Sequence, residues 1–281
     1  MGNPPHCDRR SQLPLTTLAL MLALLSMGPV APCLAADSGP PPPEEWTIRV
    51  TALVMAADLS GEADFTGGET VGGNLIRGEL DYGDVYPDPQ PLWFVDFSAK
   101  RGRWGLWVRG QYLGWDDVVA LANMTLLEET SWFVEADAGH AVGAHWWMFL
   151  GIRRFDVELV AEIPMPPGMP FPPSISTWVD ESWTDPIAGA EFRYALATSW
   201  EIAGRGDVGG FGVGSQLSWS LEATLQWNVG RHFGVTGGYR AFDADYENEW
   251  THTFSDGHQI AVVDTYDTRT DGPTLGVTFH W

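Results

Sequence analysis

Two histidines near the C-terminal end of the chain are residues from which a hydrolytic site could be built. His252 and His258 lie close in sequence to Ser255, Asp256 and Asp264. Histidine is the usual general base in such sites. No nucleophile motif surrounds Ser255, however, and an acidic segment contains such neighbours by chance. The pattern therefore favours a protein that is not an enzyme, with a surface enzyme as the weakest alternative.

Carboxylates are the second group with potential chemistry. Asp243, Asp245, Glu247 and Glu249 alternate along the sequence, so they would line one face of a strand. Segment 58–91 adds eight acidic residues and a single arginine. Oxygen ligands of this kind suit Ca²⁺ or Mg²⁺, which could bridge to lipopolysaccharide phosphates. The competing interpretation is a solvated acidic surface with no cofactor, since no calcium-loop spacing is present.

Charged residues of both signs also alternate with apolar residues along several stretches. They are Arg49, Arg109, Arg153, Arg193, Arg205 and Arg240, with Asp96, Glu135, Asp137, Glu191, Glu201, Asp207 and Glu222. Charges withdrawn from water must be paired. We therefore expect an interior plugged by ion pairs, in which Glu222 meets Arg205 or Arg240. The alternative is a narrow pore lined by the same residues, although balanced signs argue against strong ion selectivity.

These residues need strands to position them, and segment 216–229 shows the required pattern most clearly. Every second residue of QLSWSLEATLQWNV is polar, and those between are apolar. Successive side chains of a strand point to opposite faces. The run is about twice the usual strand length and is long enough to cross a bilayer at a tilt. We expect a transmembrane strand with its apolar face toward lipid.

Nine further stretches repeat this alternation. The ten predicted strands are residues 46–56, 92–100, 103–115, 131–139, 145–157, 184–197, 200–208, 216–229, 233–246 and 272–281. The predicted external loops are residues 58–91, with a candidate hairpin near 70–80, and 116–130, 159–183, 209–215 and 248–269. They alternate strictly with short turns. This organisation predicts an all-β fold, a transmembrane antiparallel up-and-down β-barrel of about ten strands, within a range of about 8–12.

Aromatic residues mark the expected membrane interfaces. Those beside the short turns are Trp46, Trp104, Trp146, Trp200, Trp227, Phe233 and Trp281. Trp115, Trp132 and Trp219 lie near the opposite strand ends and form a candidate second girdle. Trp concentrates at membrane–water interfaces, so this sorting favours a barrel over a soluble β-sandwich.

Residues 1–36 have the features of a secretory signal peptide. Arg9 and Arg10 precede an apolar run, and cleavage is expected after Ala35 or Ala36. The arginine pair also suggests twin-arginine export. Sec export is favoured, because a barrel must reach its membrane unfolded.

Cys33 raises the alternative of a lipoprotein, which the preceding proline disfavours, and the apolar run is short for an uncleaved anchor. Both cysteines, Cys7 and Cys33, lie in this leader, so the mature chain is expected to lack disulfides and thiolate metal sites. Residues 37–45 are then a proline-rich periplasmic lead-in, and residues 46–281 form the barrel.

The charge balance restricts the partners. The chain has 15 basic and 37 acidic residues, a net charge of −22, and Lys100 is its only lysine. Such a surface repels nucleic acid. After the leader, no apolar run approaches the length of a transmembrane helix, so a membrane location requires strands. Outer-membrane lipid and lipopolysaccharide are the expected partners.

The chain resembles the small bacterial outer-membrane β-barrel proteins of the OmpA/OmpW-like group. The alternating C-terminal residues Leu275, Val277, Phe279 and Trp281 match the signal that such barrels present to the barrel-assembly machinery. WTDPIAGAEFRY (183–194), GRGDVGGFGVGS (204–215) and GYRAFDADYE (238–247) look like segments of an uncharacterised proteobacterial branch of that group. The resemblance implies the fold and a location in the outer membrane, and it supplies no catalytic residues.

The expected function is that of a non-enzymatic outer-membrane barrel with a plugged lumen and acidic external loops, in a structural or surface-interaction role. The alternative is a narrow channel for small hydrophilic or amphipathic solutes.

Overall fold

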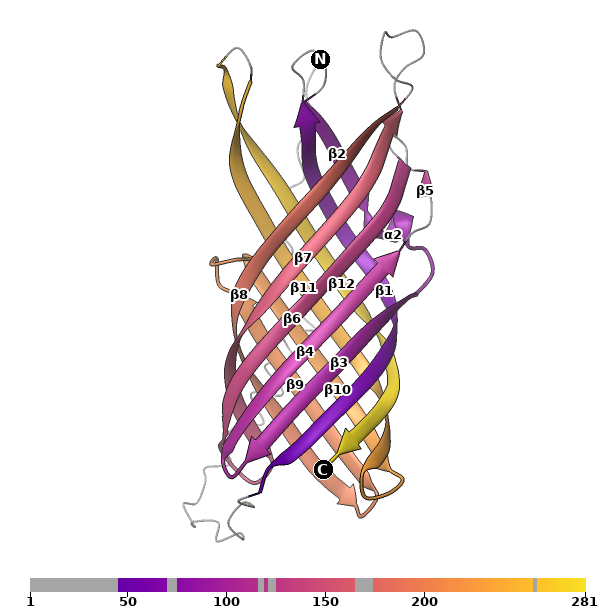
Figure 1. Ribbon diagram of the computed structural model, residues 1–281, viewed down its shortest axis with the longest axis vertical. Coiled ribbons are helices and arrows are strands. Elements are labelled where there is room, and N and C mark those ends of the chain that lie inside the picture. Colours follow the sequence, from indigo (N-terminus) through magenta and orange to yellow (C-terminus); the bar gives the residue numbers. More distant parts are fainter. Residues whose placement is uncertain (1–44, 70–74, 116–118, 121–124, 165–173, 255–256) are drawn as a thin grey trace, which may run out of the picture. The chain divides into compact units, whose positions relative to one another are not determined.

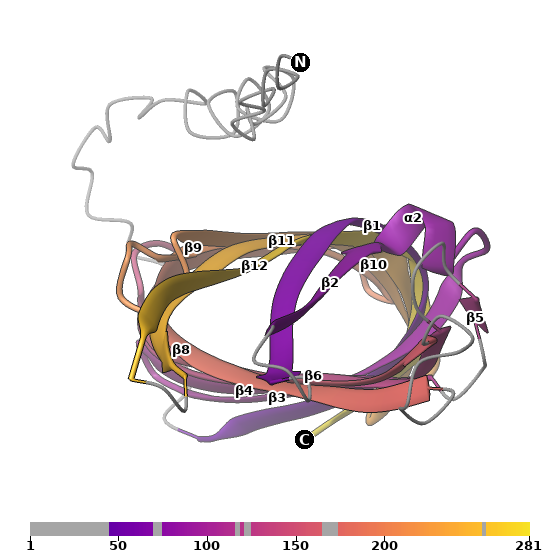
Figure 2. The ribbon, with the colours of Figure 1, turned by 90° about the horizontal axis from the view of Figure 1, so that it is seen from above.

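The computed structural model describes residues 45–69, 75–115, 119–120, 125–164, 174–254 and 257–281. Ten tilted antiparallel strands close into a barrel, because the first strand pairs with the last (Figures 1 and 2). They are β1 (Thr47–Glu69), β3 (Gln90–Arg101), β4 (Trp104–Trp115), β6 (Thr125–Ala141), β7 (Trp146–Pro164), β8 (Ser174–Ala197), β9 (Trp200–Gly210), β10 (Leu217–Asn228), β11 (Phe233–Thr253) and β12 (Gln259–His280). The predicted fold class and strand number are confirmed.

Two short strands and one helical turn lie outside this ring. β2 (Leu75–Asp81) pairs with the upper part of β1, and α2 (Tyr82–Val85) follows it. β5 (Val119–Ala120) pairs with β6. A hairpin is therefore present near the predicted residues 70–80, but it extends β1 and adds no strand to the barrel.

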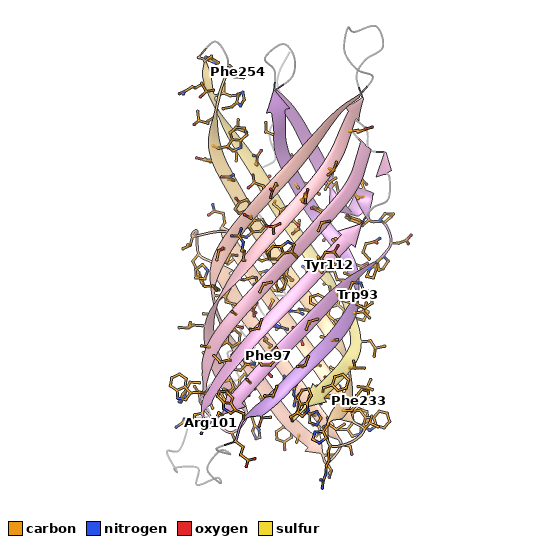
Figure 3. The ribbon with its side chains drawn as sticks, in the orientation of Figure 1. Trp93, Phe97, Arg101, Tyr112, Phe233 and Phe254 are labelled. Carbon is orange, nitrogen blue, oxygen red and sulfur yellow. The ribbon has the colours of Figure 1, made fainter. Side chains whose placement is uncertain are left out.

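The outer surface of the lower half of the barrel is apolar. On β7, Met148, Leu150 and Ile152 are each more than half exposed, whereas Phe149 between them is buried. Large apolar side chains on an outer surface are expected where the solvent is lipid. Tryptophans beside the lower turns are exposed as well, namely Trp46, Trp104, Trp146, Trp200, Trp227 and Trp281. Arg101 and Phe233 mark the same end of the barrel (Figure 3).

The upper edge of this apolar belt differs from the predicted second girdle. Trp219 is only 3 % exposed, and its ring lies 5.9 Å from the guanidinium of Arg269. Trp132 is half-buried, and the side chain of Trp115 lies outside the described residues. Trp93 and Tyr112, register partners on β3 and β4, are 59 % and 50 % exposed and lie at mid-height (Figure 3). They mark the upper interface instead.

Above this level side chains still point alternately inward and outward, but the polar and apolar residues exchange faces. On β7, Ile152 faces outward within the belt, whereas Phe155 faces inward and Glu158 outward above it. Water replaces lipid as the outer solvent there, so polar side chains take the outer face and apolar ones fill the interior. The predicted loops at 159–183 and 248–269 are therefore wrong over much of their described length, because β7, β8, β11 and β12 continue through them.

Candidate functional site in the barrel lumen

The lower lumen is filled by charged side chains that point inward. Near the lower end of the barrel, Glu201 accepts hydrogen bonds from Arg49 (2.6 Å) and Arg193 (2.8 Å). Arg193 also donates to Glu191 at 2.7 Å, and Lys100 reaches the same carboxylate at 2.5 Å. Arg49 and Lys100 lie on β1 and β3, whereas their partners lie on β9 and β8. These pairs therefore span the lumen instead of following one strand.

Glu135 lies at the centre of a larger ion-pair group at mid-depth. Its carboxylate accepts hydrogen bonds from Arg153 and Arg205, both at 2.5 Å. Arg153 also donates to Asp207, and Arg205 to Asp137, each at 2.6 Å. The side chains of Glu135, Arg153 and Asp207 are fully buried. We call these five residues the central cluster. Since a buried ion that loses its partner is costly, the central cluster holds β6, β7 and β9 together at this depth.

Glu222 also pairs across the lumen, which differs from the predicted arrangement. Arg205 and Arg240 are its register neighbours on β9 and β11, but Arg205 turns to the central cluster. Glu222 accepts a hydrogen bond from Arg109 of β4, which also donates to Asp96 at 3.1 Å. Arg240 is the lesser partner, with its Nε 3.8 Å from the Glu222 carboxylate. Its guanidinium lies over an aromatic ring instead, 4.2 Å from the centroid.

The structure places every residue of the predicted charge network in these three groups. The sequence did not single out Lys100 or Asp185, although both have the inward phase of their strands. Asp185 is fully buried and accepts hydrogen bonds from Ser215 (2.7 Å) and Ser218 (2.8 Å), which anchors the β9–β10 connection. The proposed insertion signal faces outward and is exposed at Leu275, Val277, Phe279 and Trp281. Its role in insertion stays a prediction.

An aromatic cluster fills the lumen above the charges. The rings of Phe133, Phe155 and Phe242 lie 5.5–5.6 Å from one another. Below them, the Arg153 guanidinium lies 5.4 Å from the rings of Phe133 and Phe242. Above, Trp183 stacks on Tyr246 with ring centroids 4.1 Å apart. Aromatic faces attract cations, so this cluster covers the buried arginines and separates them from the external end.

Glu129 has a buried carboxyl group that the sequence did not indicate, because residues 116–130 are a predicted loop. It is fully buried on β6 and accepts hydrogen bonds from the hydroxyls of Tyr82 (3.3 Å) and Tyr86 (2.5 Å) on α2 and the residue after it. Burial raises the pKa of Glu129 to about 7, and the two tyrosine hydrogen bonds oppose that shift only in part. The contact fastens the segment after β2 to the barrel wall.

Three small cavities lie along the lumen among the residues that the structure describes. The lowest, about 50 Å³, is lined by Arg49, Arg109, Arg205 and other members of the charge network. The next, about 40 Å³, lies among Phe133, Phe155 and their apolar neighbours. The third, about 20 Å³, lies higher, between strands that rise above the membrane belt. The two larger cavities have room for a few water-sized groups, and the smallest has room for one or two.

The alternating carboxylates predicted to favour a metal lie on the outer surface. Asp243, Asp245, Glu247 and Glu249 share the outer face of β11, which continues to Thr253. One row of carboxylates crosses four strands in register, Asp245–Asp267–Glu62–Asp81. Among the residues that the structure describes, no group of three or more His, Asp or Glu side chains is arranged to hold a metal ion. Calcium or magnesium binding stays a prediction.

The two histidines considered for catalysis lie at the tip of the β11–β12 hairpin, near Phe254 at the top of Figure 3. The ring of His252 packs on Phe254 with centroids 4.7 Å apart, and His258 lies 5.9 Å from the same ring. Asp264 faces the lumen and accepts a hydrogen bond from Trp250 Nε1 at 2.6 Å. Ser255 and Asp256 lie outside the described residues. The predicted signal peptide and most of the lead-in lie outside them too.

In the described part of the chain, no helix is both long and apolar enough to cross a bilayer.

Comparison with known proteins identifies the fold of the chain but does not assign the chain to a family. No protein-family model matches the chain, and no curated protein matches it. Among solved structures, the outer membrane protease OmpT from Escherichia coli aligns with a TM-score of 0.52 at 8 % identity, over 84 % of this chain and 97 % of OmpT. A Pseudomonas aeruginosa FadL homologue aligns at 0.36 and 9 % identity, over 84 % and 90 % of the two chains. Ail of Yersinia pestis aligns at 0.30 and 11 %, over 85 % and 99 %.

The alignment with OmpT is a likeness of fold alone at this identity. Together with the apolar belt, it identifies the chain as a β-barrel of the outer-membrane type.

Proposed function

We propose that the protein is a non-enzymatic outer-membrane barrel with a side-chain-plugged lumen, in a structural or surface-contact role through its acidic extracellular part. The central cluster carries this proposal. Its ion pairs join β6, β7 and β9 on one side of the lumen, and four of its side chains are fully buried. The aromatic cluster covers them from above. A side-chain-filled interior is the ordinary condition of a small barrel.

Liposome swelling tests this proposal. Liposomes that contain the refolded protein and are placed in an isotonic arabinose solution should swell no faster than empty liposomes. Swelling at a rate that rises with the protein content would contradict a plugged lumen. A general-diffusion porin in the same lipid serves as the positive control.

A narrow channel for small hydrophilic or amphipathic solutes is the second candidate. One observation favours it, the polar cavity of about 50 Å³ in the lower lumen. Such a channel requires the aromatic cluster or the Arg109–Glu222 pair to move aside during transport. A surface enzyme built on His252 and His258 ranks third, and an unchanged phenotype in a His252→Ala, His258→Ala double variant would dismiss it.

The remaining proposals concern biogenesis and contacts. They are kinship with the OmpA/OmpW-like group, Sec export with cleavage after Ala35 or Ala36, and insertion by the barrel-assembly machinery. The apolar belt supports contact with outer-membrane lipid, and the acidic upper surface supports an indirect contact with lipopolysaccharide through divalent cations.

A further inference from the structure

The highest of the three cavities is lined by carboxylates and aromatic rings. It lies above the membrane belt, where Glu181 of β8 and Asp264 of β12 both line a void of about 20 Å³. Tyr246 and Tyr266 complete much of its wall. Neither carboxylate belongs to the charge network of the lower lumen.

Asp264 is the unusual member of this group. Its side chain is 6 % exposed, and its Oδ2 accepts the hydrogen bond from Trp250, whereas its Oδ1 has no hydrogen-bond partner. Glu181 accepts from the hydroxyl of Tyr246 (3.1 Å) and from Asn248 (3.4 Å). Burial raises the pKa of Glu181, and the charge of Asp264 adds to that shift. Within the described residues, no ion pair with lysine or arginine reaches either carboxylate.

The aromatic walls suit a cation as well. Tyr246 and Tyr266 line the cavity. Trp183 lies behind them, with its ring centroid 4.1 Å from that of Tyr246 and 5.6 Å from that of Tyr266. The faces of such rings attract a cation electrostatically, and more strongly where water is excluded. A buried carboxylate without a positive partner is costly. A cation in this cavity would therefore relieve a cost that the folded chain carries by itself.

The size and the donors of the cavity select the kind of cation. One water-sized group requires about 10–15 Å³, so about 20 Å³ accommodates an ammonium head with its first methylene and excludes a quaternary ammonium. A hard metal ion takes six or more oxygen ligands, and no group of three or more His, Asp or Glu side chains in the described part of the chain is arranged to hold one. We propose that Asp264, Glu181 and the surrounding rings form a binding site for a primary ammonium group, carried by an alkylamine or a lysine side chain.

Isothermal titration calorimetry of the refolded full-length barrel tests this site. The probes are n-butylammonium chloride and Nα-acetyl-lysine methylamide, titrated at pH 7.5 in 150 mM NaCl to screen the acidic outer surface. Saturable heat from either probe is expected, and the probe that binds more tightly identifies the source of the group. Asp264→Asn should weaken binding at least tenfold, and Glu181→Gln should weaken it as well.

Glu158→Gln is the matched control, because Glu158 faces outward on β7 at the same height and is exposed. It should leave the affinity unchanged. Asp264→Asn should still fold. In the absence of amine it should unfold at a higher temperature than the wild type, because it removes an unpaired buried charge. Absence of saturable heat in the wild type would overturn the proposal. So would equal affinity in Asp264→Asn, or heat from CaCl₂ but from neither amine. None of these readouts depends on whether the lumen conducts.

Discussion

Arg109 and Glu222 lie on strands β4 and β10 on opposite sides of the barrel, yet their side chains meet as an ion pair in the lumen. Arg109 is 3 % exposed and also binds Asp96, so the pair is part of the plug and is largely shielded from water. The account of a closed lumen depends on contacts of this kind.

Removing the negative partner of that pair should destabilise the barrel. Glu222→Gln leaves Arg109 and Arg240 short of a countercharge. We expect a loss of about 3 kcal/mol in the free energy of unfolding, the low end of the range for breaking a buried pair, because Glu222 is 14 % exposed. Urea unfolding in lipid, followed by heat-dependent gel mobility, measures it. The exposed Glu249→Gln should change stability by less than about 0.5 kcal/mol, and equal effects in both variants would contradict this assignment.

Closure of the barrel should depend on Gly276 of β12. A Cβ at Gly276 would lie 2.1 Å from the carbonyl oxygen of Ala52 on β1, the strand that closes the ring. Backbone cannot yield as a flexible side chain does, so Gly276→Ala should cost more than the roughly 1–3 kcal/mol of ordinary overpacking. Gly230→Ala, in a turn with open space around it, is the control. Similar folded yields of the two variants in gel-mobility assays would refute this role for Gly276.

Burial of Glu129 beneath the two tyrosines should become less favourable as the pH rises, because the ionised carboxylate is costly to bury. Burial raises the pKa of Glu129 from its ordinary 4.5 to about 7 in the folded state. A raised pKa gives stability that is complete below about pH 4.5 and is lost as the pH rises through 7. The difference amounts to about 3 kcal/mol. Hydrogen exchange at the Tyr86 amide, which bonds to the Tyr82 carbonyl at 2.8 Å, should report this loss. Glu129→Gln should flatten the pH dependence, and an unchanged profile would contradict the assignment.

The outer row of carboxylates should destabilise the upper sheet at low salt. Asp267 lies in register between Asp245 and Glu62, and burial together with these two charges raises its pKa. Like charges opposite one another on neighbouring strands repel. Asp267→Asn should therefore raise the unfolding free energy by about 0.5 kcal/mol at low salt, and the gain should vanish near 1 M NaCl, where charges are screened beyond about 3 Å. Asp156→Asn, whose register partners are uncharged, should show no such gain.

The sequence predicted the membrane-spanning part of the fold well, because lipid surrounds that part uniformly. Within the belt, apolar residues such as Leu150 alternate with inward polar ones, and the terminal strands were expected to meet in a closed ring. Above the belt, apolar residues such as Phe155 and Phe242 face inward and polar residues face outward. A prediction that places apolar residues outside ends these two strands at residues 157 and 246, whereas β7 and β11 continue to Pro164 and Thr253. For the same reason, the sequence did not indicate Glu129 or the upper cavity.

Lumen contacts were harder to predict than lumen residues. The alternation placed Glu222 and Arg109 on inward faces, but adjacency along the sheet pointed to Arg205 and Arg240 as partners. Which side chains meet across a lumen depends on the tilt and stagger of the strands, and a single strand does not encode these quantities. Trp219 shows a similar limit. The alternation correctly places it on the outer face, but it does not reveal that Arg269, two strands away, helps to cover its ring.

Single-channel recording in planar lipid bilayers tests the closed lumen most directly. The refolded wild-type barrel, inserted in 1 M KCl under applied voltage, should give no steady conductance steps, because the central cluster and the aromatic cluster fill the lumen. Reproducible steps of uniform size from the wild-type protein would contradict the account, and would show that the ion pairs line an open pore.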